Sequence, residues 1–143
     1  MTVADAGTDY VLSDQVGFIL RQVHQRHAAI FAEAFGDEFT PTQWAVLAKL
    51  AERGECSQNL LGRLVSMDVA TVKGVVDRLT KRGLAATRPD GEDRRRVLVA
   101  STVCGLDVYR AGVATAAEVT ENTLDPLAPE ERRLFLSLLR RLR

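Results

Sequence analysis

Three consecutive arginines, Arg94, Arg95 and Arg96, carry the most distinctive chemistry in this sequence. They follow Pro89-Asp90-Gly91-Glu92-Asp93, a run rich in residues that favour tight turns. Guanidinium groups are permanently charged and bind phosphates and base edges through paired hydrogen bonds. At the tip of a β-hairpin they would suit phosphates or a narrow minor groove, where negative potential is concentrated. The sequence therefore indicates a basic probe for nucleic acid.

The segments beside this turn predict the hairpin that would carry the arginines. Leu84 to Arg88 is short and bounded by turn residues, and Val97 to Ala100 is a β-prone run. A very short additional strand is predicted at Glu55-Cys56, beside the hairpin.

A helix is predicted directly before the hairpin, centred on residues 67–79 and closing at residues 81–84. Asp68 is suited to its N-cap, and Gly83 to the position after its C-terminus, where a left-handed conformation is favoured. Its apolar residues repeat at three- and four-residue steps and share one face: Val69, Val72, Val76 and Leu79.

The opposite face of this helix carries Thr71, Lys73, Gly74 and Asp77, and therefore has no large apolar group. A helix with an apolar back and a short polar front fits a DNA major groove. The same pattern alone is typical of any solvent-exposed helix, so the basic hairpin that follows is what favours DNA. Helix starts would add phosphate contacts through free backbone N–H groups. The candidate DNA-binding residues are Ser57, Gln58, Ser66, Asp68, Ala70, Thr71, Lys73, Gly74, Arg78, Arg94, Arg95 and Arg96.

The order helix, helix, "VVDRLTKRGL" and then "RPDGEDRRRVLVAST" resembles the MarR family of winged-helix transcription regulators. The resemblance runs from about Ser13 to Arg143, and the Asp-x-Arg signature of the wing stands at residues 93–95. It implies that Thr71 and Lys73 face the major groove and that Arg95 enters the minor groove. Many members carry arginine or another long polar residue where this chain has Gly74, so Lys73 would take over that contact.

The resemblance implies a mainly α fold of six helices with a small β-hairpin wing. The length of 143 residues suits one domain. We expect a winged-helix lobe over about residues 40–101 and dimerisation helices over about 13–35 and 102–143. The first helix wraps apolar residues around more than one face, which independently suggests burial against a second subunit. Small residues at 111–117 would permit close helix approach in such a dimer.

Several local signals fix the remaining helices. Ser13 or Asp14 is predicted to cap the first helix, and Thr40 with Gln43 to form a capping box around Pro41. Ser57 is predicted to cap a third helix. The residues expected to face inward are Trp44, Leu47, Ala48 and either Leu50 or Ala51 in the second helix, Leu60, Leu61 and Leu64 in the third, and, along one side of the fifth, Leu106, Tyr109, Val113, either Ala116 or Ala117, and Thr120.

The composition is that of a soluble globular protein. The hydrophobic fraction is 46% and the formal net charge is zero. Residues 40–101 nevertheless hold eleven basic and seven acidic side chains, and this local excess is what phosphates would meet. We find no secretory, membrane-spanning, catalytic or metal-binding pattern, and expect a cytoplasmic protein with no cofactor.

A small effector is implied by the resemblance, often an aromatic acid or a phenol bound between the lobes. His24 and His27 are neighbours on the first helix, and either they make ordinary hydrogen bonds or one of them holds such a ligand together with Arg21. Trp44 belongs either to the core or to a pocket wall. The candidate ligand-binding residues are Arg21, His24, His27, Trp44 and Tyr109.

These expectations define a homodimeric, ligand-responsive repressor on a pseudo-palindromic operator with half-sites about 10 bp apart. Two alternatives stay open. The winged helix could serve as a protein-interaction module, or Cys56 or Cys104 could sense oxidants, since both are expected to be reduced thiols.

Overall fold

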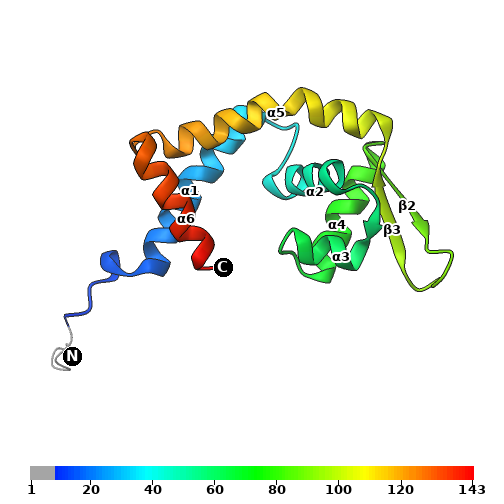
Figure 1. Ribbon diagram of the computed structural model, residues 1–143, viewed down its shortest axis with the longest axis horizontal. Coiled ribbons are helices and arrows are strands. Elements are labelled where there is room, and N and C mark those ends of the chain that lie inside the picture. Colours follow the sequence, from blue (N-terminus) through cyan, green and yellow to red (C-terminus); the bar gives the residue numbers. More distant parts are fainter. Residues whose placement is uncertain (1–8) are drawn as a thin grey trace.

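A computed structural model describes residues 9–143. The sequence predicts a loosely held arm over residues 1–11, and most of that segment lies outside the described residues. Figure 1 shows two bodies joined along their upper edge by the long helix α5. Helices α1 and α6 lie beneath one end of α5, and α2, α3 and α4 lie with a small sheet beneath the other. The elements are α1 Val16–Phe35, α2 Pro41–Arg53, β1 Cys56–Ser57, α3 Gln58–Leu64, α4 Val69–Lys81, β2 Ala85–Pro89, β3 Val97–Ser101, α5 Val103–Leu124 and α6 Pro129–Arg141.

The sheet is antiparallel, with strand order β1-β3-β2. Val99 is its central residue, paired with Cys56 on one side and with Thr87 on the other, and it is fully buried. The predicted hairpin and the short strand beside it are therefore confirmed. We call α2, α3, α4 and this sheet the winged-helix lobe.

Most of the predicted helix ends are confirmed. Thr40 Oγ1 accepts from the Gln43 amide at 3.2 Å, and the Gln43 side chain accepts from the Thr40 amide, which completes the capping box. Ser57 Oγ accepts from the Leu60 amide at 3.2 Å. The predicted cap at Ser13 or Asp14 is wrong, because both residues lie in a 3-10 turn, Leu12–Asp14, and Gln15 occupies the N-cap of α1.

The core of the winged-helix lobe is closed by side chains that are at most 1% exposed. Val69 and Leu64 were expected to face this core, but they are 68% and 38% exposed. Val69 lies in the first turn of α4, whereas Val75, which periodicity had not singled out, is buried. The fully buried members are Val46, Leu47, Leu50, Leu61, Val72, Val75, Val76, Leu79 and Val99.

An aromatic cluster joins this lobe to α1 and α5. Trp44 packs at ring-centroid distances of 5.1 Å from Phe35, 5.6 Å from Phe39 and 5.4 Å from Tyr109. Gly112 of α5 lies directly against Trp44, since a Cβ built there would be 2.7 Å from the indole ring. The small residues of α5 thus serve packing inside the subunit at this point, while Val113, expected to face inward, is exposed.

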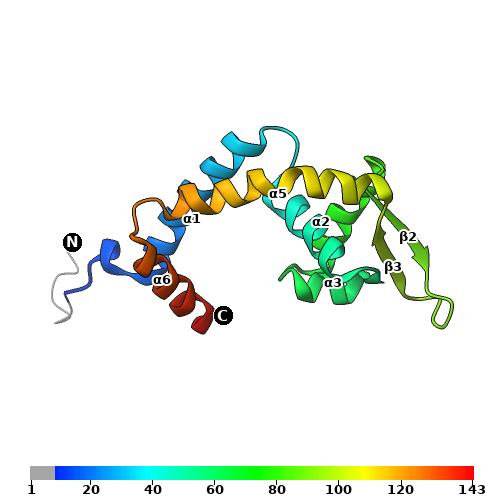
Figure 2. The same cartoon turned by 45° about the horizontal axis from the view of Figure 1, so that its top comes forward.

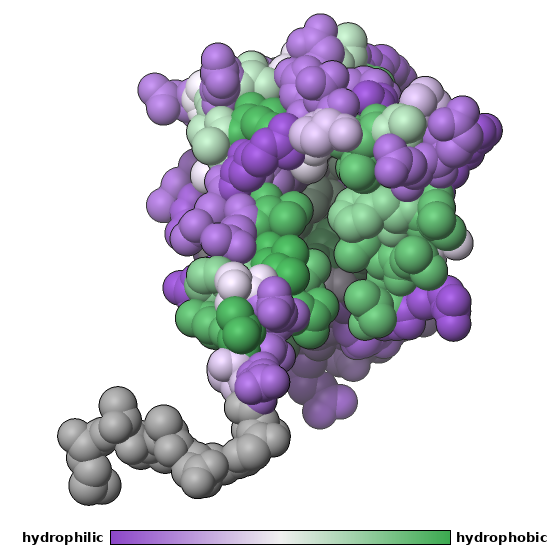
Figure 3. Space-filling view, turned by 90° about the vertical axis from the view of Figure 1, so that its left-hand side faces the viewer, coloured by the Kyte–Doolittle hydropathy of each residue, from purple (hydrophilic) through white to green (hydrophobic). Residues whose placement is uncertain are grey.

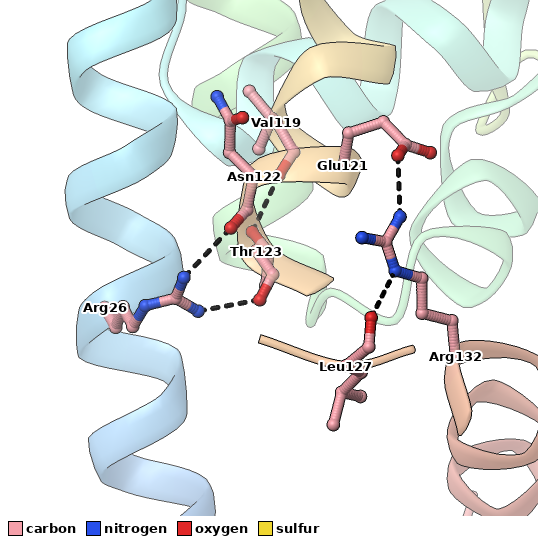
Figure 4. A network of polar contacts seen from close by, with 7 residues as sticks. All are labelled: Arg26, Val119, Glu121, Asn122, Thr123, Leu127 and Arg132. Carbon is pink, nitrogen blue, oxygen red and sulfur yellow. Dashed lines mark hydrogen bonds and ion pairs between the residues drawn. The ribbon is translucent and has the colours of Figure 1, made fainter. Parts of the chain in front are cut away.

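Polar contacts fix α6 and α1 around the end of α5 (Figure 4). The Arg26 guanidinium of α1 donates to the carbonyl oxygens of Thr123 and Asn122 at 2.7 and 2.9 Å. Arg132 of α6 donates to the Leu127 carbonyl at 2.9 Å and pairs with Glu121 at 2.8 Å. These bonds satisfy carbonyls that a helix end leaves free.

A broad apolar face remains uncovered on α1 and α6. Figure 3 shows hydrophobic side chains gathered in two neighbouring areas on this side of the molecule, with a hollow between them. The large apolar side chains here that are at least 40% exposed are Val16, Ile19, Leu20, Val23, Leu134, Leu138 and Leu142. Within residues 9–143, no helix has the length and apolar character to cross a membrane.

Candidate nucleic-acid interface

The wing tip projects beyond the other elements of the winged-helix lobe (Figure 2). Two carboxylates shape its turn: Asp90 accepts from the Glu92 amide and Asp93 from the Arg95 amide, each at 3.0 Å. Arg96 closes the turn, because its carbonyl oxygen accepts from the Asp90 amide and its own amide donates to the Asp93 carbonyl. Asp93, the first residue of the wing signature, therefore has a structural use.

All three predicted wing arginines are exposed, so the structure places their charges together at the tip. The Arg95 side chain is 93% exposed and makes only a 3.4 Å contact with Asp93. An arginine held this way keeps its donors available to an incoming anion.

The base of the wing is braced by an ion pair that sequence reasoning did not identify. Arg88 on β2 donates to both carboxylate oxygens of Glu55, at 2.6 and 3.0 Å. The hydrogen bond from Arg88 holds the pKa of Glu55 below its ordinary value, and the same bond raises the pKa of Arg88. The pair ties β2 to the segment before β1 and limits how far the hairpin can bend.

Helix α4 presents the polar face that the sequence predicted. Asp68 Oδ1 accepts from the Thr71 amide at 2.7 Å, and this hydrogen bond lowers the pKa of Asp68. Ala70, Thr71 and Lys73 are exposed, as expected for a groove-facing surface. Lys73, however, forms a 2.8 Å ion pair with Asp77 one turn later.

The Arg78 side chain lies back over Gly74. A Cβ built on Gly74 would be 3.6 to 3.9 Å from three atoms of the Arg78 guanidinium. Within the described range 9–143, this guanidinium has no hydrogen-bond or ion-pair partner. A long polar group therefore does cover position 74, although it comes from the next turn.

The remaining predicted contact residues lie at the start of α3 and in the turn that precedes α4. Ser57 caps α3, Gln58 begins it, and Ser66 lies in the turn between α3 and α4 with a positive φ of 57°. The two helices approach closely at Gly62, where an added Cβ would be 3.1 Å from the Met67 carbonyl oxygen. This spacing fixes the start of α4 relative to α3.

A junction between the lobe and α5 was not foreseen from the sequence. The Thr102 hydroxyl donates to the Gly83 carbonyl at 2.6 Å, and the Thr102 amide donates to the Leu84 carbonyl at 3.1 Å. Gly105 lies against the same segment, since an added Cβ would overlap the Leu84 carbonyl oxygen. The end of α4 and the start of the wing are thus bonded to the first turn of α5.

The candidate ligand residues do not all fall at one place. His27 Nδ1 is 2.9 Å from Thr123 Oγ1, and His27 and Trp44 line one cavity of about 270 Å³ between α1, α2 and α5. His24 lies in a neighbouring groove of about 360 Å³ between α1, α5 and α6, which His27 also borders. Tyr109 stacks on Trp44 outside the cavity, and Arg21 is exposed on α1 outside both spaces.

Five cavity-lining residues were not among the candidates: Phe31, Pro41, Ala116, Val119 and Thr120. The packing of α1 and α2 against α5 brings them together, and contacts between residues so far apart in the sequence leave no local signal.

The two cysteines differ in environment. Cys56 on β1 is 7% exposed, and its burial raises the pKa of the thiol, which disfavours the reactive thiolate. Cys104 is exposed on α5. Over residues 9–143, no group of three or more His, Cys, Asp or Glu side chains could hold a metal ion.

The chain is similar in sequence and in fold to known transcriptional regulators. The MarR family model matches residues 39–97. The HTH-type transcriptional repressor NicR of Pseudomonas putida is 37% identical over 94% of this chain and 86% of its own length. A probable transcriptional regulator from Pseudomonas aeruginosa is 50% identical with a TM-score of 0.88, covering 93% of this chain and 100% of that one. Bordetella bronchiseptica BpsR, whose DNA binding is regulated by 6-hydroxynicotinic acid, is 38% identical with a TM-score of 0.91, covering 94% and 97%.

Proposed function

Because the chain belongs to the MarR family, we propose that it represses transcription as a homodimer that binds an operator and releases it when a small aromatic acid binds. The observation that carries this proposal is the winged-helix lobe itself. Its α4 presents a short polar face and its wing presents three exposed arginines. A helix for the major groove and a guanidinium for the adjacent minor groove are supplied by one rigid body.

The uncovered apolar face supports the dimer. Leu134 and Leu142 of α6 are 60% and 72% exposed, and Val16 of α1 is 65% exposed. Such a contiguous apolar surface marks an interaction site in a soluble protein. A second copy would cover it through α1 and α6, and two-fold symmetry would then present two α4 helices to half-sites about 10 bp apart on a pseudo-palindromic operator.

The cavity beside Trp44 is the proposed effector site. BpsR responds to a hydroxylated pyridine carboxylate, and an aromatic acid of that size suits a space of about 270 Å³. Trp44 and Phe31 offer ring faces, while His27 and Thr120 offer polar groups at its edge. Arg21 and His24 would contact the effector only if the partner subunit brings them nearer to this cavity.

The cavity lies between the winged-helix lobe and the helices α1 and α5, so an occupant would act on the angle between them. A ligand that binds one angle better than the other shifts the population toward it. Release of DNA then requires that the favoured angle spaces the two α4 helices wrongly for neighbouring major grooves.

The relatives are transcriptional regulators, and we propose no catalytic role. Action on chromosomal DNA would place the protein in the cytoplasm. The test is fluorescence anisotropy of labelled duplexes from the promoter of its own or an adjoining gene. A complex that weakens with salt and dissociates on addition of 6-hydroxynicotinic acid or a related aromatic carboxylate supports the proposal. If no such fragment is bound at low salt, the proposal fails.

A further inference from the structure

We propose that Gly74 and Arg78 form one base-reading unit, in which the Arg78 guanidinium, lying over the bare backbone of Gly74, donates to a guanine in the major groove. This assignment rests on the proposed function and names a specificity-determining residue for it. It starts from geometry. On α4 the buried positions are Val72, Val75, Val76 and Leu79, and Gly74 lies on the side away from them.

A long side chain on a helix points back toward the preceding turn, so Arg78 is directed at the residue four positions earlier. That residue is a glycine, and the guanidinium occupies the space in front of it, 3.6 to 3.9 Å from where a Cβ would stand. Gly74 is half-buried although it faces outward. The charge of Arg78 is thereby brought from the third turn of α4 to the second, nearer the helix start that enters the groove.

The other long side chains of this helix and its end are less suited to read bases. Lys73 is paired with Asp77 at 2.8 Å. Arg82 lies over the Phe39 ring at 4.7 Å and contacts Gln43. Lys81 is exposed in the last turn, but an ammonium is a point charge without a planar fork. Among these side chains, Arg78 combines a guanidinium without a hydrogen-bond or ion-pair partner in residues 9–143 with a position over the outward-facing Gly74.

The chemistry of this group selects guanine. A guanidinium donates two parallel hydrogen bonds, and in the major groove guanine presents two acceptors, O6 and N7, at matching spacing. Glycine at position 74 lets the helix backbone lie close to the base pairs. The Arg78 guanidinium, which lies flat along the helix, then reaches the base edge.

The experiment selects bound sites from a library of random duplexes with the wild type, Arg78→Lys, Gly74→Leu and Lys81→Ala. The wild type should select a G·C pair at one fixed position in each half-site. Arg78→Lys should lose that preference, keep the others, and bind the wild-type site about 5- to 150-fold more weakly. Gly74→Leu should alter the same position, because leucine fills the space of the guanidinium.

Lys81→Ala removes one charge from the same helix and is the matched control, expected to keep every base preference. Thermal melting of each variant verifies folding. The assignment is overturned if Arg78→Lys keeps the wild-type preferences, or if Gly74→Leu and Arg78→Lys change different positions. If the wild type selects no sequence, the proposed function itself fails, and this assignment fails with it.

Discussion

The Thr102 hydroxyl donates a 2.6 Å hydrogen bond to the carbonyl oxygen of Gly83, and so joins the start of α5 to the end of α4. The same hydroxyl accepts from the Gly105 amide at 3.0 Å, which caps α5. Helix α5 runs from this junction to the apolar face that a second copy would cover. A change in how two subunits meet can therefore reach α4 and the wing through bonded contacts.

Replacing Thr102 by valine should destabilise the fold by about 1–2 kcal/mol, because a helix cap and a hydrogen bond are lost together. Thr102→Ser, which retains the hydroxyl, should stay within about 0.5 kcal/mol of the wild type. Urea unfolding followed by circular dichroism measures both. Equal stability of the two variants would show that the junction contributes nothing to folding.

Gly105→Ala should destabilise by about 1–3 kcal/mol or more, since its Cβ would overlap the Leu84 carbonyl oxygen. Gly17→Ala is the matched control, because a Cβ there meets nothing within 4 Å on the helix α1. That change should instead stabilise by about 0.5–1 kcal/mol through helix propensity. The same unfolding titration compares them, and a well-tolerated Gly105→Ala would contradict the close packing of α5 on the backbone of Leu84.

Local chemistry made much of the fold predictable. The caps at Thr40, Ser57 and Asp68 and the glycine after α4 depend on neighbouring residues only, and all four were identified correctly. Val69 was misplaced because the apolar periodicity continues into the first turn of α4, where this side chain is 68% exposed. The contacts of Gly112 with Trp44 and of Thr102 with Gly83 depend on tertiary packing, so no spacing in the sequence could reveal them.

The candidate site divides in the same way. The exposed wing arginines follow from turn chemistry and sequence order, whereas the effector cavity depends on how α1 crosses α5. His27 and Trp44 were named as candidates and do share that cavity, but Arg21 and Tyr109 lie outside it. The position of Arg78 over Gly74 could not be predicted from the helix alone, because it depends also on the direction that the Arg78 side chain takes.

The Glu55–Arg88 pair should make stability depend on pH on the acid side. Since the folded-state pKa of Glu55 is lowered, its contribution is present above the ordinary carboxylate pKa and is lost as pH falls through the folded-state value. Glu55→Gln should therefore lower the melting temperature at pH 7 and narrow the gap to wild type toward pH 3. Melting curves across this range measure it, and a gap that stays constant with pH would contradict the pairing.

Arg95→Ala should weaken operator binding by about 1–3 kcal/mol and reduce the salt dependence of binding by about one counterion. The reason is that an almost fully exposed guanidinium at the wing tip is free to enter a minor groove. Arg110→Ala removes an exposed arginine of α5, paired with Asp107, and should leave binding nearly unchanged. Equal losses in the two variants would indicate a general charge effect.

The central claim is that two copies of the chain, joined through α1 and α6, bind one duplex. Light scattering on the free protein and on its complex with a selected duplex tests this directly, beside Leu138→Glu on the exposed apolar face of α6. The account predicts a dimer in solution, two protomers on each duplex, and loss of both in the variant. A stable monomer, or a complex with one protomer per duplex, would contradict it.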